Sequence, residues 1–375
     1  MERDLKVSAW WAHKQGLDGS LEGARPVDIL NRTGWVRSLG GSAPYLTFFS
    51  RGGIRREVVD AALANLEIHE LPAARGCTYV VGAPDYALAL AAGQPFSGDE
   101  MKVARKLGVT DAEMTVLRTA VAAALKAGTL GTDELKAKLG DTVRNLGPDG
   151  AKKGITTTLP VALGLMQSAG EIRRVPVNGR LDQQRYKYAL WTPNPLDTWK
   201  QPPEQALAEL ARKFFDWFGP ATLKSFQDFA GTGVTAAKKA LQSIDLVEIS
   251  RETGFIAQHE AEAFRKFRAP AKPVYALVSN IDNVKLHRGE TPVMDLPRES
   301  NPIYDRGVLV GRWDFDTVTM SVVWASSVND KALEASIHKT EAFIREDLGD
   351  VRGFSLDSPK SRVPRIEALR KAAGG

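Results

Sequence analysis

The stretch EQALAELARKFFDWFGPATLKSFQDFAGTGVTAAKKALQSIDLVEISRETGFIA, residues 204–257, decides the fold. Its first part has apolar residues at helical spacing, so one helix face gathers Ala206, Leu210, Phe214 and Phe218. Gly219 and Pro220 then end this helix, because a proline cannot continue it. The residues that follow predict a helix-turn-helix.

A short helix is predicted at 221–230, followed by a turn at the glycines of 231–233. The next helix has an apolar face made of Val234, Ala237, Leu241 and Ile244. Two cations lie off that face and are predicted to contact DNA: Lys238 and Lys239.

Residues 246–256 alternate apolar and polar side chains around a Thr-Gly turn, which indicates a β-hairpin. Three helices followed by a hairpin predict a winged helix, and winged helices most often bind duplex DNA. The alternative is a set of ordinary helical hairpins whose lysines are merely solvated.

A second copy of this plan spans 111–190, with helices at 112–127 and 132–139 and a turn at 147–154. Its presumed recognition helix starts near Thr158, and its inward face is Leu159, Ala162, Leu163 and Met166. Four polar residues precede this helix and are predicted to contact DNA: Lys152, Lys153, Thr156 and Thr157.

The ribbon of this copy, IRRVPVNGRLDQQRYKYAL at 172–190, has an Asn-Gly turn and a dense positive charge. Its cations are Arg173, Arg174, Arg180, Arg185 and Lys187. This ribbon is the best candidate in the chain for DNA contact.

Two Pro-rich breaks, TPNPLDTWKQPPE at 192–204 and APAKPVY at 269–275, divide the chain. We predict an N-terminal helical, winged-helix-like domain at 1–96, winged helices at 97–192 and 193–269, and a C-terminal α+β domain with a basic tail at 270–375. Helices are expected at 7–14, 26–39 and 331–348, and strands at 77–81, 274–278, 307–315 and 320–325. The fold class is mainly α with β-hairpin wings.

Composition excludes several classes of protein. With 43% hydrophobic and 25% charged residues, the chain is globular, and a net charge of +5 permits a polyanionic partner.

The lone Cys77 and five histidines match no metal or disulfide pattern, so no metal is expected. Gly231, Gly233 and Ala236 fit a loose dinucleotide fingerprint, but a helix precedes them, so no cofactor is expected. No signal peptide or long apolar run is present, which predicts a cytoplasmic protein.

Three further groups are candidates. Arg51 begins a basic turn at 51–56 and is predicted to contact DNA. In NIDNVKLHR, 280–288, Asp282 follows a strand, where catalytic groups are common, although a structural ion pair is the commoner explanation. The tail is rich in Lys and Arg, and it is either a phosphate-facing strip or, more commonly, a solvated terminal helix.

This order of parts resembles the family of DNA-crosslink and alkylation glycosylases typified by AlkZ and YcaQ. The resemblance rests on WWAHKQGL (10–17), SAPYLTFFSR (42–51), RGCTYVV (75–81), FFDWFGPATLKSFQDFAG (214–231) and VLVGRW (308–313). It implies tandem winged helices with a β-rich C-terminal domain, and excision of damaged bases. The family holds the attacking water with a Q-x-Q or Q-x-D pair, whose positions correspond here to Arg37, Ser38 and Leu39.

Three hypotheses follow for a protein whose expected partner is double-stranded DNA. The first is a divergent N-glycosylase in which Asp282 or Ser38 positions water; Leu39 cannot accept a hydrogen bond, and Arg37 opposes oxocarbenium charge. The second is a damage sensor or transcription-type factor that binds DNA without turnover. The third is a scaffold whose winged helices bind protein. Neither the lesion nor the oligomeric state follows from the sequence.

Overall fold

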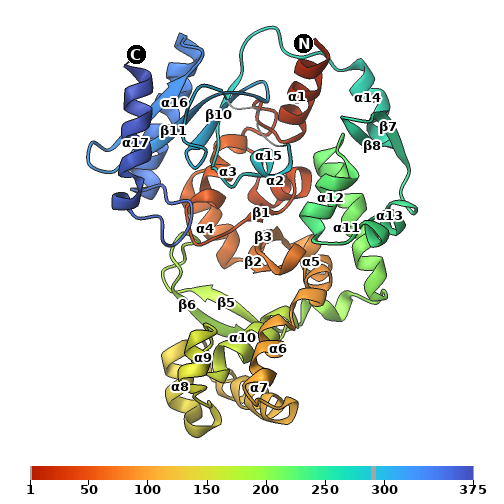
Figure 1. Cartoon of the computed structure of the whole chain (residues 1–375), viewed down its shortest axis with the longest axis vertical. Helices are drawn as coiled ribbons and strands as arrows, with labels where there is room; N and C mark the ends of the chain where they lie inside the picture. The colour runs from red at the N-terminus through yellow and green to blue at the C-terminus, as the bar shows by residue number, and fades with distance from the viewer. Residues whose placement is uncertain (1, 289–292, 375) are drawn as a thin grey trace.

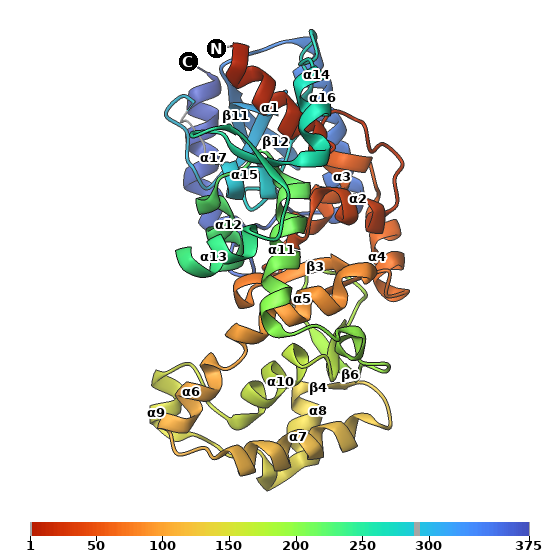
Figure 2. The ribbon, with the colours of Figure 1, turned by 90° about the vertical axis from the view of Figure 1, so that its right-hand side faces the viewer.

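The computed structural model describes residues 2–288 and 293–374. Figure 1 shows an elongated molecule, with both chain ends near one pole and the group from α6 (Asp99–Lys106) to α10 (Thr158–Ser168) at the other. In the turned view of Figure 2 this group lies below β3 (Thr78–Gly82) and α5 (Tyr86–Gly93). Residues 97–192 thus extend away from the rest of the chain.

A small sheet forms the centre of the N-terminal region. Its antiparallel strands lie in the order β1 (Val36–Arg37), β3, β2 (Ile68–Pro72). The helices of this region are α1 (Glu2–Lys14), α2 (Pro26–Thr33), α3 (Ala43–Gly52), α4 (Arg56–Ala64) and α5. Tyr79 and Leu71 pack into one hydrophobic core, and Val36 and Val80 pack into another. Because alternate strand residues face opposite sides, the sheet separates the two cores.

The helix expected at 26–39 was wrong at its end. Helix α2 stops at Thr33, and Gly34 has a φ of +91°, which favours glycine. The chain then turns through the fully buried Trp35 into strand β1, where Val36 pairs with Val80. Strand β2 was not predicted, because IHELP contains charged residues and does not alternate.

Residues 97–192 have a core of their own. The helices are α6, α7 (Asp111–Leu125), α8 (Thr132–Leu139), α9 (Gly147–Lys152) and α10, and the strands lie in the order β4 (Leu130–Gly131), β6 (Tyr186–Leu190), β5 (Ile172–Pro176). The Thr110 hydroxyl caps α7 by accepting the Glu113 N–H at 3.1 Å. The turn predicted at 147–154 is instead a helix over most of its length, and Pro148 lies in its first turn, where a proline is tolerated.

Residues 193–269 contain the predicted three helices and hairpin. They are α11 (Pro203–Phe218), α12 (Leu223–Ala230), α13 (Val234–Leu241), β7 (Leu246–Ser250) and β8 (Gly254–Ala257), followed by α14 (Ala261–Lys266). The Thr222 hydroxyl caps α12 by accepting the Ser225 N–H at 3.1 Å. Gly231 ends that helix in the left-handed region, at a φ of +67°. Helix α11 shares a hydrophobic core with the N-terminal region.

The C-terminal region contains an antiparallel sheet in the order β12 (Ser321–Ser326), β11 (Val308–Asp316), β10 (Asn301–Asp305), β9 (Tyr275–Leu277). Its helices are α15 (Asn283–Arg288), α16 (Lys331–Phe343) and α17 (Pro359–Ala373), and α16 continues as a π-helical turn at Ile344–Leu348. Three of the four strands were predicted. Strand β10 was missed because Pro302 lies inside it.

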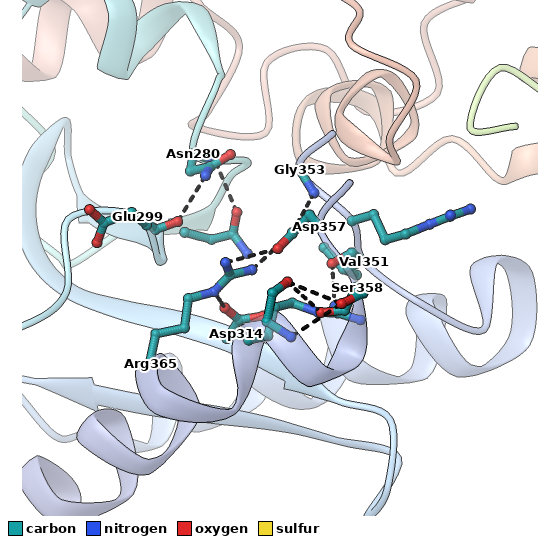
Figure 3. A network of polar contacts seen from close by, with 12 residues as sticks. Asn280, Glu299, Asp314, Val351, Gly353, Asp357, Ser358 and Arg365 are labelled. Carbon is teal, nitrogen blue, oxygen red and sulfur yellow. Dashed lines mark hydrogen bonds and ion pairs between the residues drawn. The ribbon is translucent and has the colours of Figure 1, made fainter. Parts of the chain in front are cut away.

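The basic tail is a helix, but it is not merely solvated. Figure 3 shows the Arg365 guanidinium forked onto the Asp357 carboxylate, with both N···O distances at 2.9 Å, while its Nε donates to Asp314. Arg362 is fully buried and pairs with Asp350, and Arg370 pairs with Asp316. Each of these three arginines already pairs with a carboxylate. This geometry does not fit a strip of cations that faces DNA phosphates.

The predicted fold class is confirmed: the protein is mainly helical α+β, with small hairpin sheets and a C-terminal antiparallel sheet. Within the described ranges, no helix is both long and apolar enough to span a bilayer. Over the same residues, no group of three or more His, Cys, Asp or Glu side chains is arranged to hold a metal ion.

Candidate functional site

The segment Arg37–Ser38–Leu39 lies at the end of edge strand β1, and the strand geometry sorts its side chains. In register, Val36, Val80 and Glu70 form one row across the sheet, and Arg37, Tyr79 and Leu71 form the next. Ser38 follows with its N–H donated to the Thr78 carbonyl at 3.1 Å. Because side chains alternate, Ser38 shares the face of Glu70, and Arg37 turns to the other.

Ser38 is buried, at 2% exposure, and its hydroxyl donates to the Glu70 carboxylate at 2.5 Å. Glu70 is itself buried, at 5% exposure; its other oxygen has no close hydrogen-bond partner within the described residues, and Glu70 helps burial to raise the pKa of Tyr186. The Ser38 hydroxyl proton is therefore used in a buried hydrogen bond to Glu70. Ser38 therefore faces the protein interior.

Arg37 is only half-buried, and within the described part of the chain no carboxylate pairs with it. Its Nη2 donates to the Cys77 sulfur at 3.4 Å, and its buried Nε has no acceptor. Thiol sulfur is a weak acceptor, so this contact leaves most of the charge uncompensated. Leu39 is also half-buried, and its carbonyl accepts from the Ser355 N–H at 3.2 Å and the Gln184 amide at 3.3 Å.

Arg75 lies near Tyr79, the residue that pairs with Arg37 in the sheet, and its backbone has a left-handed conformation, with a φ of +57°. Such a conformation costs a non-glycine residue free energy and is more common at functional sites. Arg75 packs against the turn between α12 and α13: a Cβ on Gly231 would lie 2.5 Å from its Cγ. Its side chain contacts the Tyr79 hydroxyl, and burial raises the pKa of Tyr79 although Arg75 and Arg37 oppose that shift.

His287 on α15 packs among Phe214, Phe218 and Phe229, with ring centroids 4.7–5.9 Å away. Burial lowers the pKa of His287 to about 3; the charges of Arg75 and Arg37 act in the same direction, and those of Asp282 and Asp228 oppose it. The imidazole is thus neutral at physiological pH, and its Nε2 has no hydrogen-bond partner among the residues that the structure describes. It lines a pocket of about 400 Å³ together with the hydroxyl-bearing Ser8, Thr222, Ser225, Ser250 and Thr253.

Two predicted site residues, Asp282 and Arg51, bind each other. The Arg51 guanidinium donates to both Asp282 oxygens, at 2.9 and 2.8 Å, and both side chains have no exposed surface. Asp282 also accepts from the Thr47 hydroxyl at 3.1 Å and the Val284 N–H at 3.0 Å. Neither predicted role fits this geometry, because Asp282 has no oxygen left for a water and Arg51 cannot reach a phosphate.

The predicted cations of the ribbon at 172–190 differ in availability. Arg180 is forked onto Asp182, Lys187 lies 3.5 Å from Glu134, and Arg174 stacks over the Tyr186 ring at 5.2 Å. Burial lowers the pKa of Arg173. Arg185 is exposed, and its side chain makes no hydrogen bond or ion pair within the described residues.

The predicted cations outside the ribbon are mostly exposed. Lys238 and Lys239 lie on the open side of α13, and Lys153 and Thr156 lie before α10. Lys152 is exposed beside Asp149, and Thr157 is half-buried as the residue preceding α10.

Sequence reasoning missed Arg75 and Glu70 and named His287 only as a neighbour of Asp282. Arg75 belongs to RGCTYVV, but nothing in that stretch shows that it meets the α12–α13 turn 156 residues away, at Gly231. Glu70 lies in the strand that the sequence pattern did not reveal.

Comparisons with known proteins agree on one family. A family model described as DNA glycosylase AlkZ-like matches residues 31–343. Among solved structures, the chain is similar to the DNA glycosylase AlkZ of Streptomyces sahachiroi, with a TM-score of 0.70 and 20% identity over 90% of this chain and 96% of that one. No curated protein matches the sequence.

Proposed function

Because this chain belongs to the AlkZ-like DNA glycosylase family, we propose that it binds double-stranded DNA and senses alkylated or crosslinked bases without removing them. The observation that carries this proposal is the geometry of the β1 end. Arg37 and Leu39 are half-buried, whereas the intervening Ser38 is buried and donates its hydroxyl to Glu70. These are the positions that correspond to the water-holding pair of the family.

Base excision needs an acceptor that orients water and a site that tolerates positive charge on the sugar. Leu39 provides no acceptor, and the guanidinium of Arg37 repels a developing oxocarbenium ion. The nearby carboxylates do not replace the pair, because Glu70 is buried behind Ser38 and Asp282 is saturated by Arg51. The site therefore favours binding over hydrolysis.

The proposed DNA surface is built from winged-helix parts. Helix α13 presents Lys238 and Lys239, the hairpin of the preceding unit presents Arg185, and Lys153 and Thr156 precede α10. Each cation that meets a phosphate releases counterions, so affinity falls steeply with salt. A lesion would be recognised by its bulk or by ease of unstacking, and not by sequence.

One observation favours a second candidate, hydrolysis by a different group. The neutral His287 ring has an unpartnered Nε2 and lines a pocket with five hydroxyl-bearing residues. A neutral imidazole nitrogen can accept a hydrogen bond from a water molecule and orient it, although a pKa of about 3 makes His287 a weak base. In this case His287 would take over the role of the missing pair in a divergent glycosylase.

The test is incubation of the purified protein with duplex DNA that carries N-alkylated purines or an interstrand crosslink, at low and moderate salt. Abasic-site formation and DNA retention are measured on the same samples. We expect salt-sensitive retention, tighter for damaged than for intact duplex, with no abasic sites above a protein-free control.

Base release that is lost in His287→Phe, while DNA retention is kept, would establish the second candidate and overturn the first. Phenylalanine suits this position because the ring already packs among three phenylalanines. Absence of DNA retention at low salt would overturn both and leave a protein-binding scaffold.

A further inference from the structure

Arg37 and Arg75 differ from the most deeply buried arginines in lacking an ion pair within the described residues, a property that they share with the half-buried Arg173 and Arg174 of strand β5. Buried Arg51, Arg362 and Arg365 each contact at least one carboxylate. Within the described residues, Arg37 and Arg75 form no ion pair with any carboxylate, and the Nε of each is buried without an acceptor. Two guanidinium groups are thus held half-buried with their charge uncompensated.

The two side chains converge on one place. Arg37 lies across from Tyr79 in the strand register and reaches the Cys77 sulfur, while Arg75 is two residues before Cys77 and contacts the Tyr79 hydroxyl. Both act electrostatically on His287, as Asp282 and Asp228 do with the opposite sign, and the His287 Nε2 has no hydrogen-bond partner within the described residues. Holding like charges together in a partly desolvated site is unfavourable unless an anion offsets them.

From this arrangement we infer that Arg37 and Arg75 form a phosphate-binding site, and that its occupant is a backbone phosphate of duplex DNA. A guanidinium group binds phosphate through two parallel hydrogen bonds, and two neighbouring guanidinium groups therefore suit one phosphate. The position supports a DNA phosphate over a free one, because Arg75 packs on Gly231 in the turn before α13. The inference rests on the proposed DNA binding and gives the former water-holding position a new role.

The first experiment measures the affinity of the full-length protein for duplex DNA at several salt concentrations, by fluorescence anisotropy. The variants are Arg37→Gln and Arg75→Gln, and the matched control is Arg105→Gln, an exposed arginine on α6 that pairs with Asp111. We expect each site variant to bind about tenfold more weakly. The slope of log K against log salt should fall by about 0.9 per variant, with little change in the control. Arg37→Lys should restore most of the slope.

The second experiment uses the unaltered protein and needs no variant to fold. Cys77 is the sole cysteine, is partly exposed and touches Arg37, so its alkylation rate reports on the site. Duplex DNA should slow that alkylation more than inorganic phosphate at equal ionic strength. Protection by phosphate with none by DNA would assign the site to free phosphate and overturn its DNA occupant.

The outcomes separate this inference from the function on which it rests. Wild-type binding with unchanged salt slopes in both variants would overturn the phosphate site and leave DNA binding intact. If the wild type binds no DNA, the proposed function fails, and phosphate protection of Cys77 alone decides whether the two arginines bind an anion.

Discussion

Helices α10 and α13 occupy the same place in two copies of one plan, yet the protein uses them differently. In α10, eight of eleven residues are buried, whereas in α13 only Ala237 and Ala240 of eight are buried. Helix α10 contacts α6, α7 and strand β2 of the N-terminal sheet, while α13 contacts α11 and α12 of its own unit. Helix α10 therefore forms a joint between two regions, whereas most of α13 stays exposed, as the proposed DNA contact requires.

The sequences of the two helices explain this difference once the fold is known. Helix α10 has almost no charge along its length, so every side can be buried at low cost. Helix α13 has lysines on the side away from its core, and burying them unpaired would be costly. The comparison shows that helices in the same position of two similar units can be almost wholly buried in one and mostly exposed in the other.

The largest expected effect tests α10 as a joint. Leu163 is 2% exposed, so Leu163→Ala should lower the free energy of unfolding by about 3 kcal/mol through lost burial and a cavity. The matched change in α13, Thr235→Ala at an exposed site, should cost less than about 0.5 kcal/mol. Urea unfolding measures both, and a small cost for Leu163→Ala would mean that α10 is not fixed.

The next test concerns α13 as the DNA-reading helix. The double change Lys238→Gln with Lys239→Gln should weaken duplex binding about a hundredfold if each lysine meets a phosphate, and lower the salt slope by about 1.8. The paired change Lys152→Gln with Lys153→Gln in the other unit should have a smaller effect, since Lys152 already has Asp149 beside it. Equal losses of DNA affinity in the two double variants would show that the two units do not differ in DNA binding.

The pH dependence of the free energy of unfolding tests the joint between α10 and strand β2. His69 on β2 packs against the Trp191 ring, and burial, helped by Arg173 and Arg174, lowers its pKa to about 3. The unfolded chain binds a proton below about pH 6.5, but the folded one stays neutral, so stability falls as the pH drops through 6.5. At pH 5 this loss is about 2 kcal/mol.

His69→Phe should remove that part of the pH dependence, while an aromatic ring continues to pack on Trp191. Denaturant unfolding at pH 7 and pH 5 gives the difference for each protein. A variant that loses as much stability on acidification as the wild type would show that His69 titrates normally at this joint.

The smallest expected effect concerns the ribbon of the α10 unit. Arg185 is exposed without a partner in the described structure, so Arg185→Gln should leave stability unchanged and weaken DNA binding by about tenfold. Arg180→Gln is the contrast, because Arg180 is forked onto Asp182, and its loss should affect stability more than binding. Anisotropy and thermal unfolding on both variants separate these roles.

Local pattern predicted much of the fold, because helix periodicity and turn residues act within a few positions. Helix α8 has the predicted bounds, and α11 to α13 followed in the predicted order. Errors arose where one residue overrode the pattern, as when Gly34 ended α2. Contacts between residues far apart in the sequence could not be predicted in this way. Asp282 was a catalytic candidate and Arg51 a candidate for DNA contact, and their mutual contact spans 231 positions.

The candidate site was less predictable than the fold. The resemblance directed attention to Arg37, Ser38 and Leu39, but only the strand register showed that Ser38 faces Glu70 and that Arg37 faces Tyr79. Arg75 required knowledge that η1, the short turn Ala74–Gly76, meets the α12–α13 turn. Such convergence depends on tertiary packing and leaves no periodic signal.

The alternation of side chains at the end of β1 also bears on how such a protein can evolve. Residues 37 and 39 lie on a half-exposed edge, and only residue 38 enters the interior. Two point mutations at that edge could exchange water activation for ion binding without disturbing the packed interior. Under the proposed function, this edge is where a non-enzymatic sensor and a base-excising relative with the same scaffold differ.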